Sequence, residues 1–368
     1  MHVNIPLFKA SERLSIGLSL LVCLFAGFVT TSCTTDVDVN APYRETAAVY
    51  CLLNPDSLNQ YARINRGFLN ILNKNALDIA KNEPDSTRFK NGEIKVQLVE
   101  IGPNKSDTLG LFQPVEDNKK DTTAGEFYGP DQVLFKYTGR ALRVDRSYVL
   151  KVSNPKTGFV TMAGTNLIAP FSYTLPAPTP FIDTVNYGAK KGYYLTMSPG
   201  GTTVVGVTQA GNAAVYKLDI VTHFVEYYTN GDTVRKSFIW RNSGTFGASN
   251  STSGSSITAP VDGDFFFALL KSKVTDNPAI YRREFRNFEL FVWAGGRALD
   301  NYAAVAQNYS LALGQAPTYS NFSGGLGLLS TRRSAYLSAM VSKRTVLQMN
   351  IREAGGYVHA DLHDLKFQ

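Results

Sequence analysis

Cysteine and histidine are scarce in this 368-residue sequence, which holds three cysteines and four histidines. So few cysteines exclude a disulfide-stapled scaffold, and stability must come from packing. Cys51 lies in the apolar run AAVYCLL. That setting favours a small buried side chain over a reactive nucleophile.

The few histidines leave little room for metal or nucleophile chemistry. His359 and His363 have the spacing of a zinc pair, with Asp361 and Asp364 nearby, but the segment lies close to the C-terminus and we expect a solvated tail. No G-x-S-x-G nucleophile elbow occurs. The stretch Ser323–Arg333 lacks the ending of a phosphate loop and predicts a glycine turn leading into the last strands. We therefore expect no catalytic residue, no metal and no cofactor.

Long apolar runs are absent too. The charge-free run at residues 14–29 is shorter than the roughly 20 residues that a membrane-spanning helix needs. It follows a basic start, and small residues then lead to Cys33, which is the order of a cleaved lipoprotein signal. Residues 1–32 are thus the predicted signal peptide, and Cys33 is the predicted lipidation site.

A short tether, residues 33–45, follows the predicted cleavage point. Two or three acyl chains on Cys33 would hold a folded domain on a membrane almost permanently. Asp36 and Asp38 resemble the acidic export tag of surface lipoproteins in the Bacteroidota. We expect an outer-membrane protein displayed on the cell surface, with the periplasmic leaflet as the alternative.

A strong charge of one sign is also missing. The formal net charge is +7, and removal of the signal peptide lowers it by one. Basic pairs such as Lys119-Lys120 and Arg332-Arg333 are scattered rather than gathered in a stripe. We therefore expect no nucleic-acid partner.

Short runs of Val, Ile, Tyr, Phe and Thr, separated by Gly, Pro, Asn and Asp, dominate the mature sequence and predict a mainly β fold. The stretch Asn75–Asn82 predicts one or two helical turns. In the first half we expect strands at Ala47–Leu53, Gln60–Arg66, Glu93–Ile101, Gln132–Tyr137, Ser147–Ser153 and Phe159–Ala163.

The segment from Leu142 to Tyr148 is similar to the tyrosine corner of immunoglobulin-like and fibronectin type III sandwiches. The alternative is an ordinary strand with a half-buried tyrosine. Ile168–Pro180 holds four prolines and cannot continue a central strand. We place a domain boundary there and predict two antiparallel β-sandwich domains, at residues 46–170 and 181–368.

Asn230-Gly231 predicts a hairpin with a two-residue turn. Counting outward from that turn pairs Glu226 with Arg235, Tyr227 with Val234, His223 with Phe238, and Val221 with Trp240. Residues 242–258, rich in Ser, Gly, Thr and Asn, predict a mobile loop.

We expect a helix near residues 264–274 that runs through Phe265–Val274. Asp262 or Asp264 is positioned to cap its N-terminus. Strands are expected at Asn287–Ala294, with Gly295-Gly296 as the turn, and at Tyr309–Leu313, and a short helix at Asn301–Gln307.

A family resemblance covers most of the mature chain. The residues that carry this resemblance are Cys33 with its acidic tether, the strand pair VYCLLNPDSLNQYARINRGFL, and the segments GEFYGPDQVLFKY and PTYSNFSGGLGLLSTR. In these segments the chain resembles uncharacterised outer-membrane lipoproteins of the Bacteroidota, which are classed as domains of unknown function. Such proteins are similar to accessory lipoproteins of TonB-dependent transporters. The resemblance implies a binding or assembly role with an outer-membrane protein partner, and it supplies no catalytic residue.

These observations predict a lipid-anchored, non-catalytic binding or accessory subunit of an envelope complex, which contacts an outer-membrane protein or an extracellular glycan or peptide. Tyr193-Tyr194, Tyr227-Tyr228 and Phe265–Phe267 are candidate stacking surfaces, although core packing is the commoner role of aromatic residues. A structural or adhesive envelope protein is the alternative. A carboxylate-based glycan hydrolase is the third possibility, because it needs only two acidic side chains.

Overall fold

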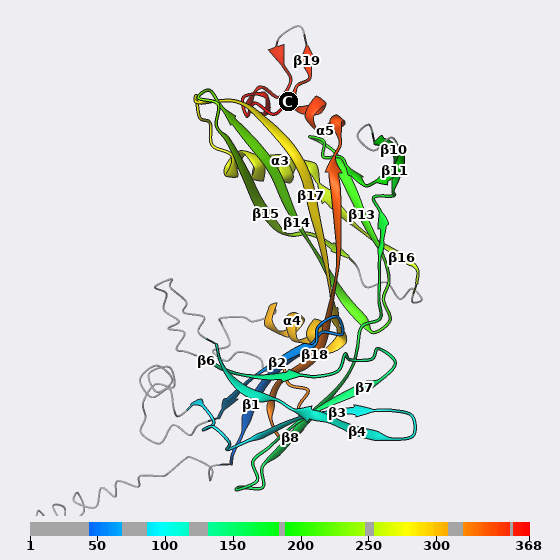
Figure 1. The fold of residues 1–368 in the computed structure, drawn as a ribbon, viewed down its shortest axis with the longest axis vertical. Coiled ribbons are helices and arrows are strands. Elements are labelled where there is room, and N and C mark those ends of the chain that lie inside the picture. The colour runs from blue at the N-terminus through cyan, green and yellow to red at the C-terminus, as the bar shows by residue number, and fades with distance from the viewer. Residues whose placement is uncertain are drawn as a thin grey trace, which may run out of the picture. The chain divides into compact units, whose positions relative to one another are not determined.

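The computed structural model describes residues 44–67, 87–117, 132–183, 188–246, 254–307, 319–353 and 356–368 (Figure 1). The described residues are mainly β, with 54% strand and 13% helix, which confirms the predicted class. Residues 45–368 form one compact unit. Among the described helices, none is long and apolar enough to cross a bilayer.

A nine-stranded sheet connects early and late parts of the chain. Its strand order is β15 (Thr233–Phe246), β14 (Ala213–Tyr228), β17 (Ile280–Gly296), β18 (Leu326–Val341), β1 (Ala47–Leu53), β2 (Asn59–Arg66), β6 (Gln132–Thr138) and β5 (Gln113–Asp117), and β12 (Tyr194–Leu195) also pairs with β18. The long strands β14, β15, β17 and β18 run side by side in Figure 1. β18 pairs in parallel with β1 and with β12, so the sheet is mixed rather than purely antiparallel.

Four smaller sheets complete the β structure. They are β4 (Ser106–Leu111), β3 (Lys95–Ile101), β7 (Ser147–Ser153) and β8 (Val160–Asn166); β16 (Ser256–Asp262), β13 (Thr202–Thr208) and β9 (Tyr173–Leu175); β10 (Thr179–Asp183) with β11 (Gly188–Gly192); and β19 (Arg352–Glu353) with β20 (Gly356–Tyr357). The described helices are α3 (Gly263–Lys273), α4 (Arg297–Gln307), α5 (Lys343–Met349) and α6 (Ala360–His363).

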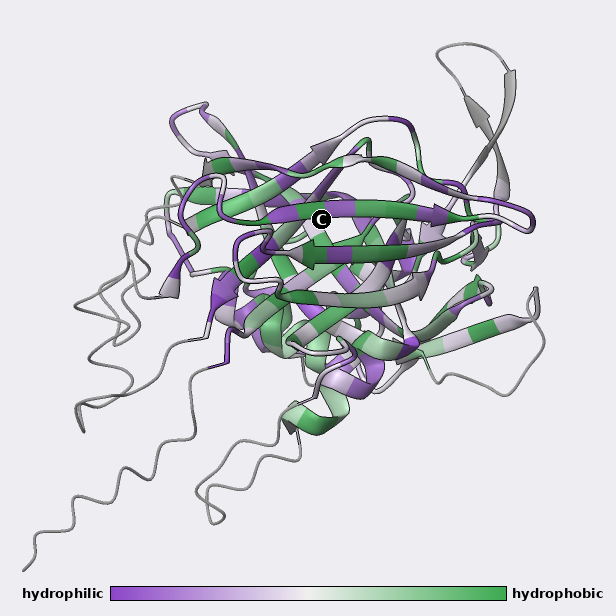
Figure 2. Cartoon of the chain, turned by 90° about the horizontal axis from the view of Figure 1, so that it is seen from below, coloured by the Kyte–Doolittle hydropathy of each residue, from purple (hydrophilic) through white to green (hydrophobic). Residues whose placement is uncertain are grey.

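Alternation of apolar and polar residues builds two hydrophobic cores. Figure 2 shows this alternation as green and purple bands along the strands. The first core holds residues from β1, β2, β3, β6 and β7, and the second holds residues from β13, β14, β16 and β17 with α3. Phe266 and Phe267 of α3 are buried in the second core, so α3 covers one face of the long strands.

The tyrosine corner is present. Tyr148 is fully buried, and its phenol oxygen accepts a hydrogen bond from the Arg143 backbone N–H at 2.7 Å. The same hydroxyl donates to Glu100 Oε2 at 2.9 Å. This confirms that the phenol bonds back to the turn that enters β7.

The β14–β15 hairpin forms at the expected place, but its predicted register is wrong by one residue. Four residues, Thr229–Asp232, connect the strands, and Gly231 takes φ +91°. Asn230 does not adopt a positive φ, so the two-residue turn cannot form. Glu226 therefore lies opposite Val234 instead of Arg235.

The same one-residue shift replaces the other predicted pairs. The observed partners are Tyr227 with Thr233, His223 with Ser237, and Val221 with Ile239, while Trp240 lies opposite Ile220. Because side chains alternate between sheet faces, the shift turns every β15 side chain to the opposite face.

Most predicted elements agree with the structure. All six expected strands of the first half are present, and α3 begins after Asp262, whose side chain accepts from the N–H groups of Asp264 and Phe265. The predicted short helix corresponds to the end of α4. The expected helix at Asn75–Asn82 and the expected strand at Tyr309–Leu313 lie outside the described residues.

Two further predictions are corrected. Gly295-Gly296 is not a turn, because both residues continue to pair within β17. The predicted loop at 242–258 is strand at both ends, since β15 extends to Phe246 and β16 begins at Ser256, and residues 247–253 lie outside the described part.

The proline-rich segment Ile168–Pro180 contributes only the short edge strand β9 and the start of β10, as its composition predicts. Leu167 belongs to the first core and Ile168 to the second. The division into two domains at this point stays a prediction.

Candidate functional site

The predicted anchor residues Cys33, Asp36 and Asp38 lie outside the described residues. Cys51 is described and is 2% exposed within β1. Burial raises the pKa of its thiol to about 12, so the reactive thiolate is disfavoured. The interpretation of Cys51 as a small buried side chain is confirmed.

The expectation of a solvated C-terminal tail is wrong. Leu362, Leu365 and Phe367 are buried in the second core because apolar residues recur along this segment. His363 Nδ1 lies 2.8 Å from Asn350 Oδ1. Within the described ranges, no group of three or more His, Cys, Asp or Glu residues lies close enough to hold a metal ion.

The stretch Ser323–Arg333 forms a turn and then the first half of β18, as predicted. Gly327 has φ +114°, and a Cβ atom there would lie 2.0 Å from the Val49 carbonyl oxygen. The glycine thus permits β1 and β18 to approach each other.

Of the aromatic residues singled out in the sequence, Phe265 is 55% exposed and the others are buried or half-buried. Phe266 and Phe267 are buried, and Phe265 stacks on Trp240 with ring centroids 5.2 Å apart. Tyr227 lies beneath the guanidinium of Arg282, whose Cζ is 4.1 Å from the ring centroid.

A different set of aromatic residues is exposed on the opposite face of the long strands. Phe291, Trp293 and Tyr336 form what we call the aromatic face. Trp293 is 41% exposed and Tyr336 is 56% exposed. Leu290 and Val292, which alternate with them on β17, are fully buried in the second core. The aromatic face therefore points away from that core and from α3.

Strand pairing brings the three rings together. Phe291 lies directly opposite Tyr336 on β18, and Trp293 is two residues further along β17. The Phe291 and Trp293 rings lie 6.3 Å apart at an interplanar angle of 16°, and the Phe291 and Tyr336 rings lie 5.2 Å apart at 50°.

Two carboxylates hold the exposed rings in place. Trp293 Nε1 donates to Asp219 Oδ2 at 3.1 Å, and Tyr336 Oη donates to Glu289 Oε1 at 3.0 Å. His223 Nε2 lies 3.0 Å from Glu289 Oε2, and this hydrogen bond lowers the pKa of Glu289. Partial burial, together with the bond to Glu289, raises the pKa of Tyr336.

Sequence reasoning missed the aromatic face, although part of its signal was present. Phe291 and Trp293 alternate within the predicted strand Asn287–Ala294, which places both side chains on one face. Tyr336 is 47 residues from its partner Glu289 in the sequence, so its place depends on strand pairing that no local pattern reveals.

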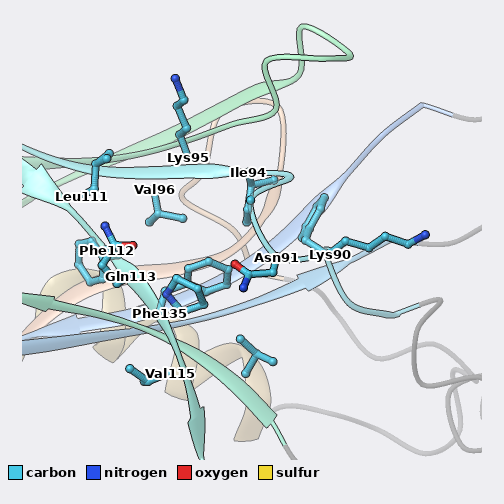
Figure 3. Close-up of a pocket in the computed structure, with 14 residues that line it drawn as sticks. Lys90, Asn91, Ile94, Lys95, Val96, Leu111, Phe112, Gln113, Val115 and Phe135 are labelled. Carbon is cyan, nitrogen blue, oxygen red and sulfur yellow. The ribbon is translucent and has the colours of Figure 1, made fainter.

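A cavity of about 330 Å³ is the second candidate. Its apolar walls come from β3, β5, β6, the residues just before β3 and the junction between β4 and β5, and include Phe89, Val96, Phe112 and Phe135. In Figure 3 the amino groups of Lys90 and Lys95 point away from the cavity, which Asn91 also lines. Its size falls in the range of small-molecule sites, and its walls offer packing contacts to an apolar group.

No protein-family model matches the chain, and no curated protein is significantly similar to it in sequence. The resemblance to outer-membrane lipoproteins stays a prediction.

Proposed function

We propose that this chain is a non-catalytic binding protein of the bacterial outer membrane, anchored by lipid on Cys33, and an accessory subunit of an envelope complex for nutrient uptake or assembly. One observation carries the binding role. Trp293 and Tyr336 are large aromatic side chains held in fixed positions while they remain exposed to solvent.

Exposed aromatic clusters mark interaction sites, because aromatic side chains are enriched where proteins bind partners. The bonds to Asp219 and Glu289 restrict the two rings before a partner arrives. A preorganised surface loses less conformational entropy on binding, which favours affinity.

The anchor, the surface display and the outer-membrane partner are supported by the signal-like leader, by Asp36 and Asp38, and by the family resemblance. A two-domain sandwich architecture, in which the two domains share β18, is part of the proposal. Its support is the tyrosine corner at Tyr148 and the division of the buried side chains into two cores.

The experiment expresses the full chain in a Bacteroidota host that is fed an alkyne-labelled palmitate. We expect the wild-type chain to carry the label and the Cys33→Ser variant to lack it. In mild detergent, we expect an outer-membrane protein to co-purify with the wild-type chain, and loss of that protein from the Trp293→Ala/Tyr336→Ala variant would locate the protein contact on the aromatic face.

Tyr281→Ala is the matched control, because Tyr281 is 55% exposed on β17 but lies outside the aromatic face. It should retain the partner. An unlabelled wild-type chain would overturn the anchor, and a wild-type chain that co-purifies with no outer-membrane protein would overturn the accessory role.

The other two functions make different predictions. If the protein is structural or adhesive, its deletion should leave nutrient uptake unchanged and should weaken the envelope or cell adhesion. A glycan hydrolase would turn over a polysaccharide, and substitution of one carboxylate would abolish that turnover.

A further inference from the structure

We propose that the aromatic face binds the pyranose rings of a neutral glycan. This inference rests on the proposed function, in which the aromatic face contacts a ligand. It names the chemistry of that ligand from the arrangement of the rings and of the polar groups between them.

The rings provide a shallow platform instead of a deep pocket. Phe291 is half-buried between the two more exposed rings, and its plane lies within 16° of that of Trp293. A pyranose ring presents axial C–H groups on its faces, and these pack against the faces of aromatic rings. Tyr336, tilted by 50° from Phe291, offers a second surface for an adjoining sugar.

The polar groups beside the platform complement the rim of a sugar. Each carboxylate has about four acceptor sites, and the Tyr336 hydroxyl and His223 occupy only some of those on Glu289. Hydroxyl groups at the edge of a stacked pyranose would donate to the remaining sites. Asn287 and Ser338, which bond to each other at 3.1 Å, add amide and hydroxyl groups on the same face.

The charges select among ligand classes. Asp219 and Glu289 disfavour a phosphate or a uronate next to the rings. His223 lies against Glu289, and Arg241 Nη1 lies 4.0 Å from Asp219 Oδ2, so both carboxylates already have a basic neighbour. Lys217, which is exposed and lies opposite Trp293, adds a further positive charge that offsets the two carboxylates. A neutral ligand rich in hydroxyl groups fits this balance better than an anion or a cation.

The test uses the full chain, purified in mild detergent, on an array of oligosaccharides made of neutral hexoses and pentoses, amino sugars or uronates. Titration calorimetry with the best array ligand then gives the affinity. We expect neutral oligosaccharides to bind, and Trp293→Ala and Tyr336→Ala each to weaken binding by about tenfold or more. Tyr281→Ala should bind as the wild type does, since Tyr281 is 55% exposed, close to the 56% of Tyr336, but lies outside the aromatic face.

Three outcomes would overturn the inference: binding confined to uronates, binding that neither substitution weakens, and no binding to any array glycan. The last outcome separates the two proposals. If Trp293→Ala/Tyr336→Ala still releases the co-purified protein, the aromatic face docks a protein and the proposed function stands without the glycan. Unfolding temperatures equal to that of the wild type would show that the variants are folded.

Discussion

At the scale of single residues, buried polar groups hold strands to neighbouring segments. Arg283 is fully buried, and its guanidinium donates to Glu226 Oε1 at 3.0 Å, to the Leu365 carbonyl at 2.9 Å and to the Thr275 carbonyl at 2.8 Å. The one side chain thus joins β14, β17 and the C-terminal segment. A buried charge of this kind is stabilising only while all its partners are present.

Replacing Arg283 by methionine should destabilise the protein by about 3–5 kcal/mol, because Glu226 would remain buried without its charged partner. The Arg283→Met/Glu226→Gln double variant should lose less, since no unpaired charge remains. Denaturant unfolding measures both. Arg286→Ala is the control, as Arg286 is 56% exposed. An effect of Arg283→Met no larger than that of Arg286→Ala would contradict the prediction.

Tyr148→Phe should cost about 1–3 kcal/mol, because the Arg143 N–H and the Glu100 carboxylate each lose a buried hydrogen-bond partner. Burial raises the pKa of Tyr148 to about 12. The folded state therefore keeps a proton that the unfolded state releases above about pH 10.

The sign of the pH effect follows from that difference. The stabilisation by Tyr148 is present below about pH 10 and is lost as the pH rises toward 12. The free energy of unfolding should fall more steeply in the wild type than in Tyr148→Phe over this window. Equal slopes in urea titrations of the two proteins would show that Tyr148 does not carry the effect.

At the scale of elements, the contact between β1 and β18 depends on one glycine. Gly327→Ala would place a methyl group 2.0 Å from the Val49 carbonyl oxygen and would also strain a backbone at φ +114°. We expect a loss above the roughly 1–3 kcal/mol that backbone strain alone costs. Gly92→Ala separates the two causes, because Gly92 has φ +77° but open space around it. Similar losses for both variants would refute the clash.

The N-cap of α3 gives a smaller prediction. Asp262 accepts two backbone N–H bonds at 2.8 and 3.2 Å, so Asp262→Ala should cost about 1 kcal/mol. Asp262→Asn keeps an acceptor at the cap and should lose less. Thermal unfolding compares the two variants, and equal losses would indicate that the side-chain oxygen does not stabilise the helix.

Elements with a strong local signal could be predicted from the sequence, and pairings across long separations could not. The strand Ala47–Leu53 and the capped helix α3 follow from periodicity and an N-cap residue. The hairpin register depends on which residue of the turn takes a positive φ, and only Gly231 does so. The aromatic face needs β17 beside β18, which is set by tertiary packing.

At the scale of the whole molecule, β18 connects the two cores. Its first half, Leu326–Thr331, pairs with β1, and its second half pairs with β17. Leu329 belongs to the first core, whereas Leu337 and Ala339 belong to the second. A strand that is shared in this way couples the folding of the early and late segments.

The shared strand predicts that residues 45–170 do not fold alone. Without β18, β1 would become an edge strand, and the buried Val49, Cys51 and Leu53 would lose their neighbours. We expect residues 45–170 to aggregate when expressed alone and to become soluble when co-expressed with residues 171–368. The intact chain should unfold in one transition by calorimetry. A soluble, cooperatively folded 45–170 fragment would contradict this prediction. It would show that side chains of residues 45–170 suffice to cover β1, so that the first core needs no strand from the second half of the chain.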